Sequence, residues 1–387
     1  MQPIVETMMQ SIRRAVCGAT VEWPSEPFPE EALGALYRLS DLHDLAHVVG
    51  HALEEDGRLS PSGEAAEQFR RKTFLSVYRY QQLQYTYERI CRVLDAVEID
   101  YIPLKGALIR AYYPEPWMRT SCDIDILVHE SDAEEAAARL ADAIGVVRPL
   151  EREYHDISLF LEGNIHLELH FSLSEHMERM DRVLERVWDY ATPAAEGTHR
   201  YVLENAFFLF HQVAHCAYHF ANGGCGVRPL IDWWLLRRGM TCDEAALSAL
   251  LEEADLAPFA VAMERLSGVW FSGDAHDELT RDMEAYLLGA GVYGSFANSV
   301  ALANRHHSGR FAYFMHRVFM PYRNLKAVYP VLERYPVLYP FCTVCRWGRL
   351  LFGKARKKAV LEIKYASSLS DDKTQRLARM CRALHLD

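Results

Sequence analysis

The sequence has no apolar run long enough to span a membrane and no N-terminal stretch typical of secretion. A spanning helix needs about 18 consecutive apolar residues, and no segment of the 387-residue chain approaches that length. Residues 1–19 contain Arg13 and Arg14 and no continuous apolar run, which argues against a signal peptide. We therefore expect a cytoplasmic protein without a membrane span.

Closely paired cysteines, internal repeats and low-complexity tracts are also missing. The nine cysteines are scattered, and only Cys342 and Cys345 lie close together, which is weak support for zinc without a second such pair. Free thiols in a reducing compartment are the simpler interpretation. Because 50% of the residues are hydrophobic and 25% are charged, the composition excludes disordered, collagen-like and disulfide-stapled proteins.

Basic charge is scarce over most of the chain. The formal net charge is −11, which disfavours a protein that coats nucleic acid by neutralising its phosphates. The distribution is uneven, since residues 346–387 hold 11 Lys and Arg against 4 Asp and Glu. This basic tail, which includes Arg346, Arg349 and Lys354, is either a solvated helical face or a surface for a polyanion such as tRNA or for anionic lipid.

Helical periodicity dominates the chain except in one island, and four segments follow from it: residues 1–98, 99–173, 174–308 and 309–387. The first is an N-terminal helical segment with a long helix from Glu64 to about Val97. The third is a helical domain, and the fourth is a C-terminal helical region that includes the basic tail. One buried stripe is expected along the long helix, formed by Phe69, Leu75, Tyr78, Leu83 and Ile90.

The island at residues 99–173 alternates between strand and helix. Its predicted elements are a strand at 99–104, a helix at 105–112, a strand at 122–128, a helix at 133–144 and a hairpin of 155–161 with 165–171, joined by Gly163 and Asn164. The fold class is therefore α+β, a small mixed sheet between large N- and C-terminal helical segments.

Two aspartates stand at alternate positions of the strand at 122–128. Because side chains alternate along a strand, Asp123 and Asp125 point to one face. Their mutual repulsion rarely serves stability, and a divalent cation offsets it; Mg²⁺ prefers one or two carboxylates together with substrate phosphates. The alternative is an exposed edge strand with solvated acids.

A third carboxylate lies on the second strand of the hairpin. Glu168 shares a face there with His166 and His170. If this strand pairs beside residues 122–128, Glu168 sits opposite the aspartates. Three carboxylates on neighbouring strands suit a two-metal phosphoryl or nucleotidyl transfer site.

Lys105 and Gly106 stand where the first strand ends and a helix begins. A glycine there lets a phosphate approach the backbone, and the start of a helix supplies N–H donors. Lys105 can hold a triphosphate oxygen, and Arg119 is a second candidate anion ligand. The alternatives are a surface lysine and an arginine that pairs with Asp123 or Asp125.

These motifs resemble the DNA polymerase β superfamily of nucleotidyltransferases. The resemblance rests on Lys-Gly after a strand, on Arg-x-x-x-Asp-Ile-Asp-Ile-Leu-Val at 119–128 and on Leu-Glu-Leu-His at 167–170. Within the superfamily the chain is similar to a bacterial nucleotidyltransferase family with a Lys-Gly motif and large helical flanks. Segments 211–215, 227–232, 329–330 and 338–340 extend the resemblance over most of the chain. Ala107 departs from the Gly or Ser that usually follows the first Gly.

The resemblance implies an enzyme that moves a nucleoside monophosphate from an NTP such as ATP to an acceptor hydroxyl and releases pyrophosphate. It implies Asp123, Asp125 and Glu168 as catalytic metal ligands for Mg²⁺ or Mn²⁺, with Glu168 also helping to deprotonate the acceptor hydroxyl and Gly106 cradling the nucleotide phosphates. The acceptor is a small molecule, a protein side chain or a tRNA end, and the sequence does not choose among them.

Several polar residues have both a functional and a packing interpretation. His170 is either close to the metal site or a core histidine, and Arg228 and Asp232 are an intrahelical pair, a domain contact or acceptor-site residues. Two histidine ladders have the four-residue spacing of one helix face: His43, His47, His51 and His211, His215, His219. Packing, or contact with the core domain, is a simpler explanation of these histidines than zinc binding.

Two further interpretations belong to other classes of protein. The chain could be a catalytically silent member of the family that binds nucleotide as a sensor or scaffold. It could also be a helical interaction protein that uses the histidine ladders and the basic tail, and this hypothesis predicts no NTP binding.

Overall fold

A small mixed β-sheet is surrounded by helices, which confirms the α+β fold class. The computed structural model describes residues 3–23, 28–148, 150–175, 177–292, 294–304, 322, 325–326, 329–352 and 371–387. The strand order is β1–β2–β5–β4–β3, with β1 at Tyr101–Pro103, β2 at Asp123–Val128, β3 at Glu151–Arg152, β4 at Asp156–Leu161 and β5 at Ile165–His170. The neighbours β2 and β5 run parallel, and the other neighbours run antiparallel. The predicted hairpin is present as β4 and β5.

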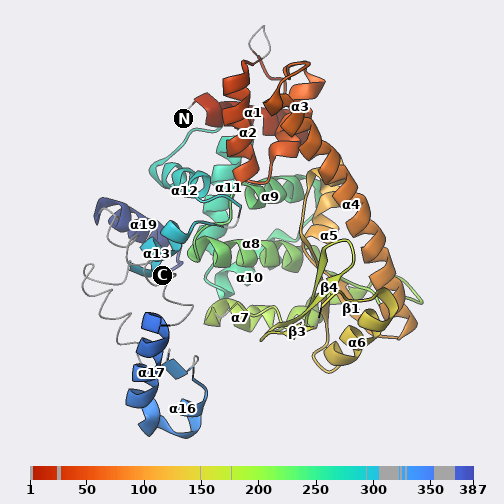
Figure 1. Cartoon of the computed structure of the whole chain (residues 1–387), viewed down its shortest axis with the longest axis vertical. Coiled ribbons are helices and arrows are strands. Elements are labelled where there is room, and N and C mark those ends of the chain that lie inside the picture. The colour runs from red at the N-terminus through yellow and green to blue at the C-terminus, as the bar shows by residue number, and fades with distance from the viewer. Residues whose placement is uncertain are drawn as a thin grey trace.

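Two helices cover one face of the sheet. These are α4 (Glu64–Ala96) and α6 (Ala133–Ile144), whose apolar side chains pack with those of the strands in one core. Ile124 and Ile126 of β2 point into this core, so the alternating Asp123 and Asp125 point to the opposite face. Figure 1 shows α4 running along one side of the molecule from the N-terminal helices to the sheet.

The long helix α4 has the predicted length, but its buried stripe is interrupted. Phe69 lies in the core of the N-terminal helices, and Leu83 and Ile90 lie in the core of the sheet. Between these two contacts Leu75 is 44% exposed and Tyr78 is 55% exposed, so their predicted burial is wrong. The helix runs from the core of the N-terminal helices to the core of the sheet. Between the two cores these side chains are exposed to solvent.

The N-terminal helices pack around the first half of α4. They are α1 (Pro3–Cys17), α2 (Glu30–Leu42) and α3 (Ala46–Glu55). Gly50 of α3 lies against Phe69 of α4, where a Cβ atom on the glycine would be 2.9 Å from the Phe69 Cβ. The glycine thus permits close approach of the two helices.

A helical layer lies over the polar face of the sheet. Its central members are α8 (Asn205–Ala221) and α9 (Arg228–Gly239), and Figure 1 shows α8 at the centre of the molecule. Around them lie α7 (Glu178–Leu184), α10 (Glu244–Glu253), α11 (Ala257–Ser272), α12 (Glu278–Leu288) and α13 (Phe296–Asn304).

The local pattern misplaced some elements in this region. A two-stranded sheet of β6 (Ala191–Pro193) and β7 (Tyr201–Leu203) lies inside the segment 174–308, for which the sequence predicts only helices. Pro193 and Gly197, whose φ of +77° suits glycine, lie between helix-forming segments and favour a turn. The helix predicted at 105–112 is a short α5 (Gly106–Ile109) followed by a 3₁₀ turn, η1 (Arg110–Tyr112).

The C-terminal helices are α16 (Val331–Arg334), α17 (Tyr339–Phe352) and α19 (Asp371–Ala383). α19 packs near α12, where Arg376 contacts Asp282 at 3.0 Å between Nε and Oδ1. Much of the predicted basic tail, including Lys354, lies outside the described residues. None of the helices in the described ranges combines the length and apolar character needed to cross a membrane.

Candidate active site

The parallel pairing of β2 with β5 brings the predicted carboxylates together. Asp125 lies directly opposite Glu168, and Asp123 lies opposite His166. Asp125 is buried, whereas Asp123 and Glu168 are partly buried. The pairing that the sequence required for a three-carboxylate cluster is therefore present.

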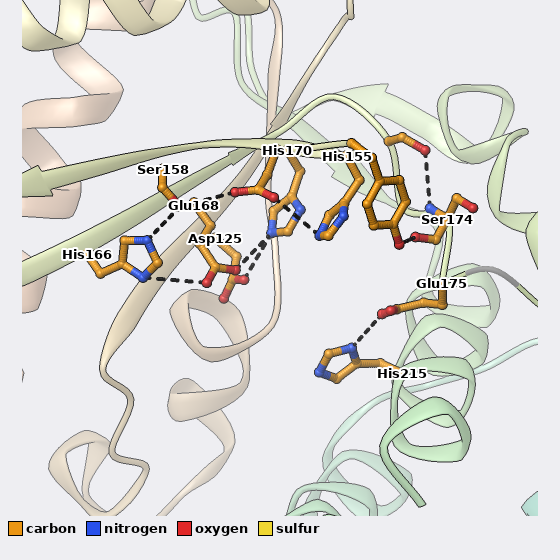
Figure 2. A network of polar contacts seen from close by, with 12 residues as sticks. Asp125, His155, Ser158, His166, Glu168, His170, Ser174, Glu175 and His215 are labelled. Atoms are coloured by element: carbon orange, nitrogen blue, oxygen red, sulfur yellow. Dashed lines mark hydrogen bonds and ion pairs between the residues drawn. The ribbon is translucent and has the colours of Figure 1, made fainter. Parts of the chain in front are cut away.

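Asp125 and Glu168 share contacts with His170. The imidazole Nε2 lies 3.2 Å from Asp125 Oδ1 and 3.4 Å from Glu168 Oε2. Figure 2 shows these three side chains pointing toward one another, with His166 beyond Glu168. The Nδ1 atom of His170 is buried and has no hydrogen-bond partner within the described part of the chain.

Lys105 is the cation of this cluster. Its Nζ lies 2.9 Å from Asp125 Oδ1. Burial alone would raise the pKa of Asp125, but the nearby Lys105 and His170 hold it well below the ordinary range. Burial and the charge of Asp125 raise the pKa of Asp123. The two aspartates are thus electrostatically unequal, and Asp125 is the one fixed in the charged form.

The donor set fits a divalent cation. One ligand atom from each of Asp125, Glu168 and His170 lies within 4.8 Å of the others. Carboxylate oxygens suit Mg²⁺ and Mn²⁺, and an imidazole nitrogen suits transition metals such as Mn²⁺ better than Mg²⁺. The sequence predicts Asp123 as the third metal ligand and gives His170 only as a residue close to the metal site. In the cluster of the structure, the third ligand atom comes from His170.

The backbone at Lys105 is unusual. Its φ of +42° and ψ of −118° are strained for a residue with a side chain, and such strain gathers at functional sites. The turn is supported by Arg110, whose Nε donates to the Gly106 carbonyl at 2.8 Å and whose Nη2 donates to Ser121 Oγ at 3.2 Å. Because α5 is only four residues long, Lys105, more than a helix dipole, makes this corner suitable for an anion.

Arg119 makes a buried ion pair with Asp232 of α9. Its Nε lies 2.8 Å and 3.0 Å from the two carboxylate oxygens, and Tyr113 donates its hydroxyl to the same Asp232 at 2.7 Å. Arg228 contacts Asp44 at 3.4 Å and donates to the Thr120 carbonyl at 3.1 Å. Asp232 and Arg228 therefore connect α9 to the segment that leads into β2, as domain contacts.

One cavity unites these residues. It has a volume of about 440 Å³ and lies between the polar face of the sheet and the helical layer. Its lining includes all the predicted site residues: Lys105, Gly106, Arg119, Asp123, Asp125, Glu168, His170, Arg228 and Asp232. Ser121 also lines it beside Gly106, and the sequence offered no signal for Ser121 beyond its place before the Asp pair.

The second histidine ladder forms the opposite wall. His211, His215 and His219 lie on α8 and line the same cavity. Glu175, in the segment between β5 and α7, lies there too and contacts His215 at 3.0 Å between Oε1 and Nδ1. Nothing in the local pattern around Glu175 marks it, since its place depends on how the helices pack on the sheet.

The first ladder serves packing. His43 lies in the turn after α2, so it does not share one helix with His47 and His51. His43 Nε2 contacts the Leu288 carbonyl at 3.2 Å, and His47 Nε2 contacts the Met118 carbonyl at 2.9 Å. These contacts join the two imidazoles to backbone carbonyls of other segments, in line with the packing interpretation.

Comparison with known sequences decides the family. The profile of a family described as uncharacterised nucleotidyltransferase matches residues 29–272, which is well over half of the chain. The chain belongs to this family. No curated protein matches the sequence, and no solved structure does. The matched range contains every residue of the cavity wall named above.

Membership makes the protein a nucleotidyltransferase, an enzyme that takes a nucleotide from a donor. Enzymes of this class typically use a divalent metal, and the cluster of Asp125, Glu168 and His170 is a site where one could bind.

Proposed function

We propose that this nucleotidyltransferase is Mg²⁺-dependent and moves a nucleoside monophosphate from an NTP to an acceptor hydroxyl, with release of pyrophosphate. The observation that supports this most is the meeting of Asp125, Glu168 and His170, with ligand atoms within 4.8 Å, in a cavity that also holds Lys105 and Gly106. We further assign the chain to the bacterial Lys-Gly type, on the motif at Lys105–Gly106.

Each residue has a separate task in this mechanism. Asp125 and Glu168 would hold the ion with His170 beside them, and Asp123 would complete its ligands once the ion's charge offsets the repulsion that raises its pKa. When bound, the ion neutralises phosphate charge and lowers the pKa of the attacking hydroxyl. Lys105 would pass from Asp125 to a phosphate oxygen of the donor as the ion takes its place.

The reaction needs little covalent chemistry from the protein. The acceptor oxygen attacks the α-phosphorus in line with the bond to the departing pyrophosphate, so catalysis rests on positioning and on charge neutralisation. Gly106 and Ser121 form the corner against which the phosphates would lie. Arg110 supports this corner through the Gly106 carbonyl and Ser121 Oγ, and Arg119 lines the cavity with its guanidinium held by Asp232.

The acceptor remains one of three classes: a small molecule, a protein side chain or a tRNA end. ATP is the first donor to test, and the cytoplasm is the expected compartment. Of the lining residues that carry charge, Lys105, Arg119 and Arg228 each contact a carboxylate, so the cavity itself offers little free positive charge to a polyanionic acceptor.

The test is a thermal-shift panel of the four NTPs with and without Mg²⁺, followed by turnover of α-labelled NTP. A ligand that binds only the native state raises the melting temperature by mass action. We expect a Mg²⁺-dependent shift with at least one NTP. Asp125→Asn and Glu168→Gln should lose both that shift and all turnover.

The matched control is Glu162→Gln, which changes an exposed glutamate in the turn after β4 and outside the cavity. It should behave as the wild type. A shift without labelled product would favour the silent nucleotide sensor, and no shift with any NTP would overturn the proposal in favour of an interaction protein. Full turnover by both carboxylate variants would show that the metal site is assigned wrongly.

A further inference from the structure

The cavity has two chemically different walls. The sheet contributes the charged cluster around Asp125, and the helical layer contributes Glu175 with the histidines of α8. Figure 2 shows Glu175 and His215 on the helical side, separate from the side chains of Asp125, Glu168 and His170. If the sheet wall holds the donor phosphates, the helical wall is the side left for the acceptor.

Glu175 and two histidines form a continuous hydrogen-bonded chain on that wall. Glu175 Oε1 lies 3.0 Å from His215 Nδ1, and His215 Nε2 lies 3.1 Å from His219 Nε2. Because a neutral imidazole donates through one nitrogen and accepts through the other, the three side chains can pass a proton along this line. His219 is exposed at the end of the chain, so the line leads to solvent.

Glu175 is held in place from its own segment as well. Its backbone N–H donates to Asp181 Oδ1 at 2.8 Å, and the preceding Ser174 donates its hydroxyl to Asp181 Oδ2 at 2.7 Å. The carboxyl group uses Oε1 for His215, which leaves Oε2 able to accept from a ligand in the cavity. A carboxylate so placed is positioned for proton transfer without binding the metal.

The surroundings of Glu175 suit proton transfer. Burial raises the pKa of the Glu175 carboxyl to about 7. A general base works best when its pKa is near the operating pH. This supports an assignment that already stands on the hydrogen-bonded chain of Glu175, His215 and His219.

We propose that Glu175, positioned by His215, is the base that accepts the proton of the acceptor hydroxyl on the helical wall of the cavity. The assignment rests on the proposed nucleotidyl transfer. The O–H bond of the acceptor breaks, its oxygen forms a bond to the α-phosphorus, and the bond from that phosphorus to pyrophosphate breaks. The proton goes to the Glu175 carboxylate and leaves through His215 and His219.

The test measures turnover of α-labelled NTP with Mg²⁺ or Mn²⁺, with water and added glycerol as the hydroxyl probes. Glu175→Gln should lower kcat about 100-fold or more, the range of a lost general base. KM for the NTP and the Mg²⁺-dependent thermal shift should stay within about twofold of the wild type, since the sheet wall is intact. A loss of fold alone would change the binding readouts as well.

His215 provides a second, independent variant pair. His215→Asn keeps an N–H near the position of Nδ1 and should retain more activity than His215→Ala, because it can still hold Glu175. The matched control is Asp100→Asn, which breaks a similar pair away from the cavity, where Asp100 Oδ1 lies 2.7 Å from His199 Nδ1. This control should leave kcat unchanged.

The outcomes separate the two proposals. If the wild type forms no labelled product from any NTP, nucleotidyl transfer fails and this assignment fails with it. If the wild type turns over and Glu175→Gln keeps kcat within about threefold, only the base assignment is overturned. An equal loss of NTP binding and kcat in Glu175→Gln would also overturn it, since the residue would then be structural.

Discussion

Arg119 and Asp232 form a buried ion pair that joins the segment before β2 to helix α9. The Arg119 Nε lies within 3.0 Å of both Asp232 oxygens, and both side chains are at most 10% exposed. A third partner, Tyr113, donates its hydroxyl to Asp232 at 2.7 Å. This network fixes helix α9 to the segment that leads into β2, the strand of Asp123 and Asp125.

Asp232→Asn should destabilise the protein by about 3–5 kcal/mol, because it leaves the Arg119 charge buried without a counter-ion. Urea unfolding measures this loss. The control is Glu244→Gln, which breaks the exposed contact of Arg237 with Glu244 at 2.7 Å and should cost less than about 1 kcal/mol. Equal effects of the two variants would show that the buried pair has no special role in stability.

His170 should make stability depend on pH. Burial lowers its pKa, but the hydrogen bonds to Asp125 and Glu168 outweigh this and raise the pKa above the ordinary value of 6.5. The contribution of His170 to the free energy of unfolding is therefore fully present below about pH 6.5, the pKa of histidine in the unfolded chain. It is lost as the pH rises through the raised pKa of His170 in the folded protein.

His170→Asn tests this directly in metal-free buffer. The variant should lose about 2 kcal/mol at pH 6, the scale of a hydrogen bond to a charged group, and clearly less at pH 9. Denaturant unfolding of both proteins at the two pH values provides the comparison. A loss that is the same at pH 6 and pH 9 would contradict a charged His170 in the native state.

Gly106→Ala should weaken NTP binding with little effect on stability. A Cβ there would lie 3.5 Å from the Ser121 side chain and 3.6 Å from Arg110 Nη2, which is ordinary contact. The protein alone therefore does not require glycine, and the space is left for a ligand. We expect NTP affinity to fall about tenfold, a loss of about 1.4 kcal/mol, measured by isothermal titration.

The control for this glycine is Gly34→Ala on α2, where the new Cβ would lie 3.6 Å from Arg38 Nη1 and far from the cavity lining. It should leave NTP binding unchanged. If Gly106→Ala unfolds the protein instead, the glycine is needed by the fold and the ligand argument does not hold.

Gly50→Ala should destabilise the N-terminal helices. The new Cβ would lie 2.9 Å from the Cβ of Phe69, an atom that no side-chain rotation can move away. Overpacking of this kind costs about 1–3 kcal/mol, which exceeds the gain of about 1 kcal/mol from replacing a helical glycine. A melting temperature above that of the wild type would show that α3 and α4 separate without cost.

The sheet and its carboxylates were predictable because their signals are local. The alternation of Asp123, Ile124 and Asp125 fixes which face is buried, and the turn at Gly163 makes the following strand pair back on β4. Glu168 meets Asp125 because β5 pairs with β2 in the register that sets these two residues opposite each other. Helix lengths such as that of α4 follow equally from periodicity.

The rest of the site depends on contacts between segments far apart in the chain. The partner of Arg119 is Asp232, not the nearby Asp123 or Asp125 that the sequence suggested as alternatives. Glu175 and His215 meet only because α8 packs over the sheet. The spacing of residues along the chain does not predict such a contact, because it depends on how the helical layer packs on the sheet.

The cavity between the sheet and the helical layer has a consequence for how the protein responds to its substrate. A donor on the sheet wall and an acceptor on the helical wall would together contact β2, β5 and α8, so part of their binding energy would hold the two layers against each other. Bound substrates should therefore stabilise the contact between the sheet and the helical layer. Amide hydrogens of α8 and of β5 should exchange more slowly in the same proportion when donor and acceptor are both bound, even though the two elements are far apart in the sequence.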